Sequence, residues 1–195
     1  MALRKEDLAF EKLSLLVSQL SAPFDAAVKR GRVWAIANQA GVTSQAGLSA
    51  TTPVLTLANP IGSGVRGKLW YASASIDVAF ATAATIYLAA GAWHQTPVTG
   101  TLTTAQRNLK LGASGPMSAI RCFLAATLPA APVAIDILGA AGTGAITVPL
   151  ILPPLGRWYN GAVSIEEGTN LSVQTSAASG TNGLWTAFFY EEEDK

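Results

Sequence analysis

From Gly31 to the C-terminus, apolar side chains recur at every second position rather than at every third or fourth. The alternation is clearest in Leu171–Thr175, and it returns in Val133–Ile137, Ile146–Val148 and Val163–Ile165. A two-residue period directs one face of a strand towards a core and the other towards solvent. Because no helix-like spacing interrupts this pattern, the sequence predicts an all-β domain.

Further apolar runs bring the expected number of strands to roughly eight to ten. Turn-forming pairs separate them, and Asn160-Gly161 and Asn182-Gly183 are typical of tight hairpins. Short strands with frequent turns predict an antiparallel β-sandwich or jelly roll. The further strands are expected at residues 32–37, 53–58, 68–80, 82–89, 117–127 and 183–191.

The N-terminal segment has a different pattern. Residues 1–32 hold ten of the 25 charged residues, and apolar side chains there recur at helical spacing. We expect this helix to end near Ser21, before Pro23, and a second short helical turn to span Phe24–Arg30, with Gly31 after it. The sequence therefore predicts a helical arm at 1–32, acting as a tether or oligomer contact, and a β domain at 33–195. The expected contact residues are Leu13, Leu16, Val17, Leu20 and Phe24.

The composition excludes several classes of protein. A net charge of +1 gives no basic face for nucleic acid. Two long stretches, 78–106 and 137–156, have no charged residue, but both contain Gly and Pro, which disfavours membrane-spanning helices. Cys122 is the single cysteine, so no internal disulfide can form. Half of the residues are apolar and only 13% are charged, which predicts that much of the surface packs against copies of the chain or other partners.

The stretch Gly62–Gly67 matches the G-x-G-x-x-G pattern of dinucleotide-binding turns. Such a site needs a helix after the glycines and an acidic residue about 20 positions further on. Here a strand is expected from Lys68, and after Asp77 the next carboxylate is Asp136. We therefore interpret the glycines as a loop that reverses the chain between two antiparallel strands, and we expect no cofactor.

Other reactive side chains form no recognisable site in the sequence. His94 is the single histidine and has no G-x-S-x-G nucleophile motif to serve. Glu166 and Glu167 are adjacent, which is poor geometry for a pair of catalytic carboxylates, and a turn at a strand end explains them better. The sequence predicts neither catalytic residues nor a metal site.

Aromatic residues are the remaining candidates for binding. Trp93, Trp158 and Tyr159 are interpreted as core or interface residues, with a sugar-stacking platform as the alternative. Trp185 belongs to a strand, 184–190, that is apolar on both faces. Such a strand either lies centrally under the arm or forms a subunit contact, and the pattern leaves both open.

Two long stretches resemble small β-rich structural proteins of tailed bacteriophages. One is TTPVLTLANPIGSGVRGKLWYASASIDVAFATAATIYLAAG at 51–91, and the other is GAVSIEEGTNLSVQTSAASGTNGLWTAFFYEEE at 161–193. The resemblance implies a virion-associated jelly roll that is often trimeric, has no catalytic residues and serves as a capsid decoration or as a fibre or tail component.

We therefore expect a non-enzymatic bacteriophage virion protein, a homotrimeric capsid decoration or cement protein that stabilises or caps the capsid. Its partners would be other copies of itself and the major capsid protein or another virion protein. It would be made in the host cytoplasm and reside in the virion. The alternative is a receptor- or glycan-binding component of a tail fibre or head fibre.

Overall fold

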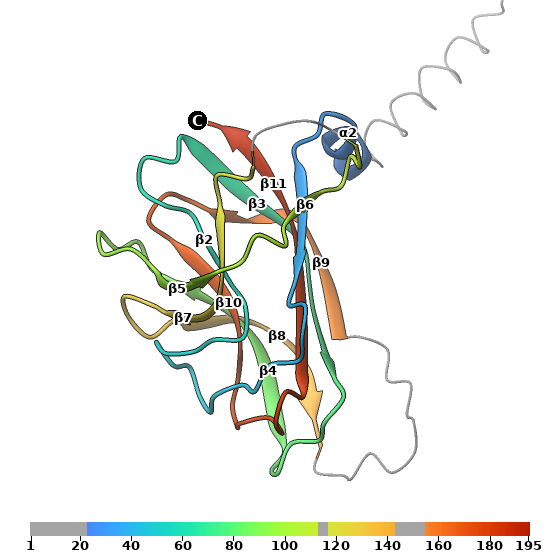
Figure 1. The fold of residues 1–195 in the computed structure, drawn as a ribbon, viewed down its shortest axis with the longest axis vertical. Coiled ribbons are helices and arrows are strands. Elements are labelled where there is room, and N and C mark those ends of the chain that lie inside the picture. Colours follow the sequence, from blue (N-terminus) through green and yellow to red (C-terminus); the bar gives the residue numbers. More distant parts are fainter. Residues whose placement is uncertain (1–22, 113–116, 143–154) are drawn as a thin grey trace, which may run out of the picture.

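The computed structural model describes residues 23–112, 117–142 and 155–195. Two antiparallel sheets pack face to face, which confirms the predicted all-β sandwich (Figure 1). The five-stranded sheet has the order β6 (Arg107–Asn108), β1 (Val33–Ala37), β11 (Leu184–Asp194), β3 (Val65–Ile76), β9 (Leu155–Ile165). The six-stranded sheet has the order β5 (Thr99–Leu102), β7 (Arg121–Thr127), β2 (Thr56–Ala58), β10 (Asn170–Thr175), β4 (Ala84–Gly91), β8 (Val133–Ala141).

The strand pairing is entirely non-local in the described residues, because no two strands that follow each other in the chain are hydrogen-bonded neighbours. Strand β11, near the C-terminus, runs between β1 and β3, with Phe188 opposite Ile36 on one side and Ala72 on the other. This central position agrees with one of the two roles expected for the two-sided apolar strand, that of a central strand under the arm. Its inner face enters the core, and Phe189 on its outer face packs in a cluster with the short helix described below.

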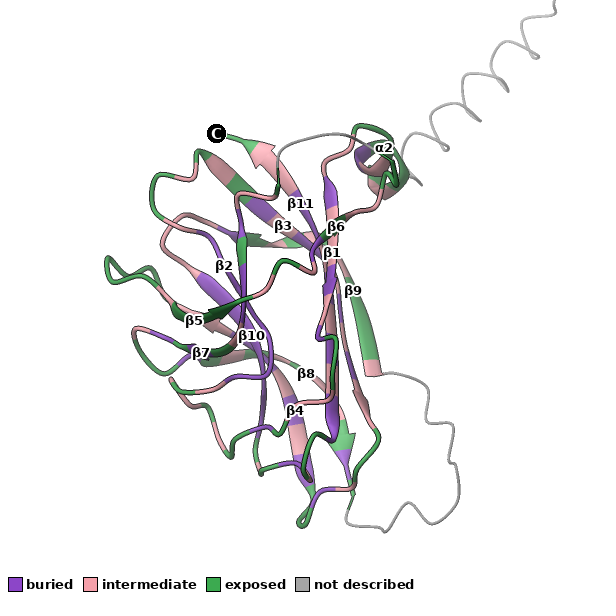
Figure 2. Cartoon of the chain, viewed as in Figure 1, coloured by how far each residue is buried: buried purple, intermediate pink, exposed green. Residues whose placement is uncertain are grey.

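The core fills the space between the two sheets, where Figure 2 shows the buried parts of the strands. Alternate residues of each strand contribute to it, as the two-residue period requires. Cys122 is one of them and lies fully buried, as its spacing from Ile120 and Leu124 suggests. The largest fully buried side chains are Tyr190, Phe188, Leu55, Leu57, Leu69, Ile86, Leu88, Ile120, Ile165, Leu171, Leu184 and Val33.

The structure corrects both hairpin predictions. Asn160-Gly161 lies inside β9, where the φ angles of 51° and 78° form a bulge opposite Trp70 of β3. Asn182-Gly183 does form a turn, and Asn182 has a φ of 56°, but this turn leads from β10 in one sheet to β11 in the other. Strands β5 and β6 were not expected, because both are short and mostly polar.

The described part of the arm is one short helix, α2 (Pro23–Lys29), followed by Gly31 with a φ of 73°. This confirms the helical turn predicted after Pro23. Ala27 is buried against the sandwich, so α2 is packed onto the β domain rather than held away from it. No helix within the described ranges is long and apolar enough to cross a membrane. The arm residues Leu13, Leu16, Val17 and Leu20 and the strand expected at Ile146–Val148 lie outside the described residues.

Candidate functional site

The G-x-G-x-x-G stretch forms a loop, with φ angles of 79° at Gly62 and 73° at Gly64 that favour glycine. Strand β3 follows, as expected, in place of the helix that a dinucleotide site needs. However, the loop does not reverse the chain within one sheet, because β2 belongs to the six-stranded sheet and β3 to the five-stranded sheet. The glycines therefore allow the chain to cross from one layer of the sandwich to the other.

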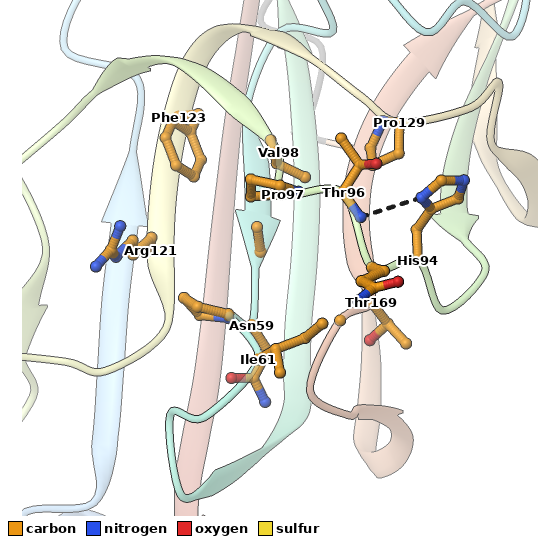
Figure 3. A pocket seen from close by; sticks show the side chains of 14 residues that line it. Asn59, Ile61, His94, Thr96, Pro97, Val98, Arg121, Phe123, Pro129 and Thr169 are labelled. Atoms are coloured by element: carbon orange, nitrogen blue, oxygen red, sulfur yellow. Dashed lines mark hydrogen bonds between the residues drawn. The ribbon is translucent and has the colours of Figure 1, made fainter.

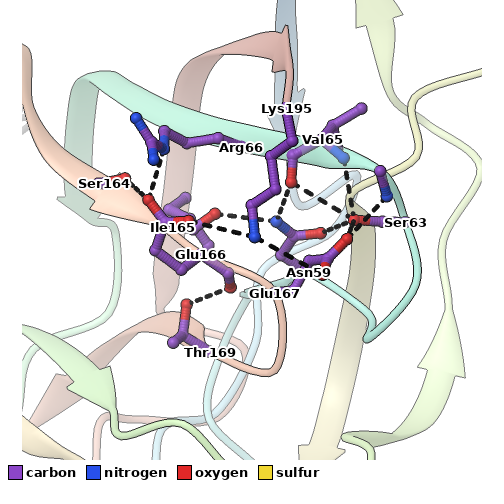
Figure 4. Close-up of polar contacts among 11 residues, drawn as sticks. Asn59, Ser63, Val65, Arg66, Ser164, Ile165, Glu166, Glu167, Thr169 and Lys195 are labelled. Carbon is purple, nitrogen blue, oxygen red and sulfur yellow. Dashed lines mark hydrogen bonds and ion pairs between the residues drawn. The ribbon is translucent and has the colours of Figure 1, made fainter.

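A buried asparagine holds this loop in place (Figure 4). The Asn59 amide nitrogen donates to the carbonyl oxygens of Val65 and Ile165, each at 2.9 Å. Its amide oxygen accepts a 2.6 Å hydrogen bond from the Ser63 hydroxyl. The loop between β2 and β3 is thereby joined to the end of β9.

Glu166 and Glu167 also contact this part of the structure, where the loop between β2 and β3 meets the end of β9. Glu166 contacts Arg66 at 2.5 Å, and Lys195 lies 3.5 Å from both Glu166 and Glu167. A hydrogen bond from Ser164 lowers the pKa of Glu166, and one from the Gly64 backbone lowers the pKa of Glu167. Both carboxylates are therefore held ionised at neutral pH and paired with cations, which suits a structural corner and not proton transfer.

The remaining reactive side chains also lack the environment of a catalytic or metal site. Burial raises the pKa of the Cys122 thiol, which removes its nucleophilic form at neutral pH. Among the described residues, no group of three or more His, Cys, Asp or Glu side chains is placed to hold a metal ion.

The outer side of the five-stranded sheet carries a cluster of five aromatic rings, which we call the aromatic face. Its contacts link α2 to three strands. Phe24 lies 5.3 Å from both Trp70 and Trp158, measured between ring centroids, and Tyr71 lies 5.0 Å from Trp158 and 5.4 Å from Phe189. Trp158 is 51% exposed although it contacts three rings of the cluster.

A bulge in β3 makes this cluster possible. The register shifts between Leu69 and Tyr71 against both neighbouring strands, so Trp70 and Tyr71 both reach the outer side while Leu69 and Ala72 stay in the core. The Trp70 indole nitrogen donates to Glu191 at 3.2 Å. The sequence identified Phe24 and Trp158, but neither Trp70 nor Tyr71, because a bulge leaves no trace in an alternating pattern.

The remaining predicted aromatic residues lie apart from one another. Tyr159 faces the space between the sheets and donates to Asp136 at 2.6 Å. Trp185 donates from its indole nitrogen to Asp77 at 2.9 Å. Trp93 lies in the loop between β4 and β5 and is 62% exposed. The structure thus does not bring Trp93, Trp158 and Tyr159 together in one platform.

A second apolar surface lies on β8, an edge strand of the six-stranded sheet. Val133, Ile135 and Ile137 are exposed and form what we call the aliphatic row. They alternate with Asp136, which bonds to β9 of the other sheet, and Leu138, which packs against the core. The alternation predicted this strand correctly, but the apolar face that we expected to find in the core points outwards.

One pocket of about 220 Å³ lies beside the C-terminal end of β2, among the loops of the six-stranded sheet (Figure 3). His94, Thr96 and Pro97 from the loop between β4 and β5 form one side, and Arg121 and Phe123 of β7 form the other. This pocket could not be predicted from the sequence, because its walls come from segments that are far apart in the chain.

Comparisons with protein-family models, with curated proteins and with solved structures find no match.

Proposed function

We propose that this chain is a non-enzymatic structural protein of a bacteriophage virion, a capsid decoration protein that works as a homotrimer. The virion part of the proposal rests on the sequence resemblance of 51–91 and 161–193. The assembly part rests on one observation, the half-exposed Trp158 at the centre of the aromatic face. A large ring exposed on a sheet face that already carries four others is typical of a binding surface.

The position of α2 supports the same role. Phe24 holds α2, the described end of the arm, on the aromatic face. The sequence pattern of Leu13, Leu16, Val17 and Leu20 gives that segment an apolar stripe that needs a partner. We propose that this stripe binds a neighbouring subunit or the capsid lattice.

The two apolar surfaces also allow the head-to-tail contacts that a cyclic trimer needs. A trimer with cyclic symmetry uses head-to-tail contacts, so each subunit must present two different surfaces that fit each other. The aromatic face lies on the outer side of one sheet, and the aliphatic row lies on the outer side of the other. We propose that the aromatic face of each subunit binds the aliphatic row of the next.

Two variants of the full chain test this arrangement by analytical ultracentrifugation. Trp158→Ala and Ile135→Asp should each turn the trimer into a monomer, with at least about a 30-fold rise in the dissociation constant, as for a central interface residue. Leu102→Ala removes a similarly exposed apolar side chain from β5, at the opposite edge of the six-stranded sheet from β8, and should leave the trimer intact. Circular dichroism checks that every variant is folded.

Mixing the two defective variants separates head-to-tail contacts from symmetric ones. Each variant keeps one working surface, so the mixture should form a 1:1 heterodimer and no trimer. A wild-type protein that is monomeric at micromolar concentration, or variants that leave the trimer unchanged, would exclude the proposed assembly. Immunogold labelling of purified virions tests the location separately, and absence of label would exclude the decoration role.

A further inference from the structure

The loop pocket has a mixed lining that the assembly proposal does not use. Its floor is apolar, with Ala58 and Phe123 on the outer side of the six-stranded sheet and Val98 beside them. The β2–β3, β4–β5 and β9–β10 loops form the walls (Figure 3). At about 220 Å³ it is smaller than the roughly 300–1,000 Å³ of pockets for drug-sized ligands. The volume therefore suits a ligand about the size of one ring.

The polar groups around this floor have hydrogen-bonding capacity to spare. Arg121 is the one charged residue in the lining, and no carboxylate lines the pocket. No described residue forms an ion pair or a hydrogen bond with the side chains of Arg121, Gln95 or Thr96. The His94 Nδ1 accepts a 3.3 Å hydrogen bond from the Thr96 backbone, which leaves a proton on Nε2 of the neutral ring for a ligand.

Trp93 is next to two residues that line the pocket. It precedes His94 in the loop, and its ring lies against Gly168, since a β-carbon added at Gly168 would come within 2.6 Å of the indole. Gly168 lines the pocket and has a φ of 78°, so its lack of a side chain leaves room for the ring. Trp93 itself is outside the lining, and nearly two thirds of it remains exposed.

We propose that this pocket binds a sugar unit that carries a carboxylate, such as a uronic acid. A sugar ring has an apolar C–H face that stacks on an exposed indole, and its hydroxyl groups need several donors and acceptors close together. Trp93 supplies the indole, and His94, Gln95 and Thr96 supply the polar groups. Arg121 pairs with the carboxylate, for which the planar guanidinium is the best-suited side chain. This site does not depend on the proposed assembly role.

Saturation-transfer NMR on the full chain tests the proposal with glucuronic acid, glucose and benzoate as probes. Glucuronic acid should bind most tightly, because it alone combines the sugar ring with the charge. Arg121→Gln should weaken glucuronic acid about 10-fold and bring it level with glucose, since a charged pair of this kind contributes about one to two factors of ten. Trp93→Ala should weaken both sugars by a similar factor.

Two matched controls keep the result specific. Arg107→Gln removes an exposed guanidinium outside the pocket, and Trp158→Ala removes the exposed one of the two indoles of the aromatic face, so neither should change sugar binding. A disaccharide ending in glucuronic acid distinguishes a glycan terminus from a free sugar acid, and either source supports the site. Benzoate binding as tightly as glucuronic acid, or no saturation transfer to any probe, would overturn the assignment to an acidic sugar.

Discussion

The side-chain amide of Asn59 is almost fully buried, and its three hydrogen bonds join the glycine loop to β3 and to the end of β9. Asn59→Ala removes both amide donors and leaves the carbonyl groups of Val65 and Ile165 without these partners. We expect the free energy of unfolding to fall by about 2–4 kcal/mol, since each unsatisfied buried group costs about 1–3 kcal/mol. Urea denaturation measures this change.

An exposed amide provides the control for Asn59. Gln95 forms no hydrogen bond with a described residue, so Gln95→Ala should change stability by less than about 0.5 kcal/mol. Equal effects from the two substitutions would show that the Asn59 hydrogen bonds do not hold the loops together.

At the next scale, α2 is a helix that cannot persist alone. Seven residues are too few for an isolated helix to be stable in water, so its contacts with the sheet must hold it. Phe24→Ala removes the ring that packs on Trp70 and Trp158. We expect α2 to detach while the sandwich stays folded, so the melting temperature should change by only a few degrees.

Hydrogen exchange detects this local change. The backbone amides of Arg30, Gly31 and Arg32 bond to the carbonyl groups of Ala26, Val28 and Ala27. Their protection should disappear in Phe24→Ala and persist in Asp25→Ala, which removes only an exposed ion pair with Lys29. Unchanged protection in Phe24→Ala would mean that α2 is held by other contacts.

The elements also show what the sequence could predict. Strand positions follow from the two-residue period, and α2 follows from Pro23, the basic residues at its end and Gly31. The orientation of β8 could not be read in the same way, because a period of two identifies an apolar face without saying whether that face is buried. Asn160-Gly161 was likewise ambiguous, since its positive φ angles serve a bulge as well as a hairpin.

For the whole molecule, the missing information is the pairing of strands. A hairpin can be predicted from the turn residues between its two strands. In contrast, β11 pairs with β1, which is far away in the sequence, and the register of this pair depends on how the side chains fit in the core. The pocket and the aromatic face both arise from this non-local pairing. Trp70, Tyr71 and Arg121 therefore could not be predicted as site residues from the sequence, because their neighbours come from distant parts of the chain.

The carboxylates of Asp136 and Glu192 should make the stability of the sandwich depend on pH in two opposite ways. Burial acts to raise the pKa of Asp136, but hydrogen bonds from Tyr159 and the Ile137 backbone and the charge of Arg157 outweigh it and lower the pKa. Asp136 bridges β8 to β9 and so joins the two sheets. Burial raises the pKa of Glu192 on β11 despite its hydrogen bonds from Ser118 and Ile120.

The two shifts have opposite effects on stability. A lowered pKa means that the folded state releases its proton more readily than the unfolded state, so the contribution of Asp136 is present above the unfolded pKa and is lost as the pH falls through the folded value. A raised pKa means the reverse, so the contribution of Glu192 is present below the unfolded pKa and is lost as the pH rises through the folded value.

Isosteric variants isolate each contribution in urea denaturation between pH 3 and pH 7. Asp136→Asn should be less stable than the wild type by about 1 kcal/mol at pH 7, and the difference should shrink as the pH falls, because the wild-type carboxyl then also begins to take up a proton. Glu192→Gln should be at least as stable as the wild type at pH 7, and its advantage should disappear in acid because the protonated carboxyl resembles the amide. If the stability differences of both variants changed in the same direction with pH, the opposite pKa shifts would be contradicted. Asp136 would then not be a carboxylate whose charged form is stabilised by hydrogen bonds and Arg157, or Glu192 would not be one whose charged form is disfavoured by burial.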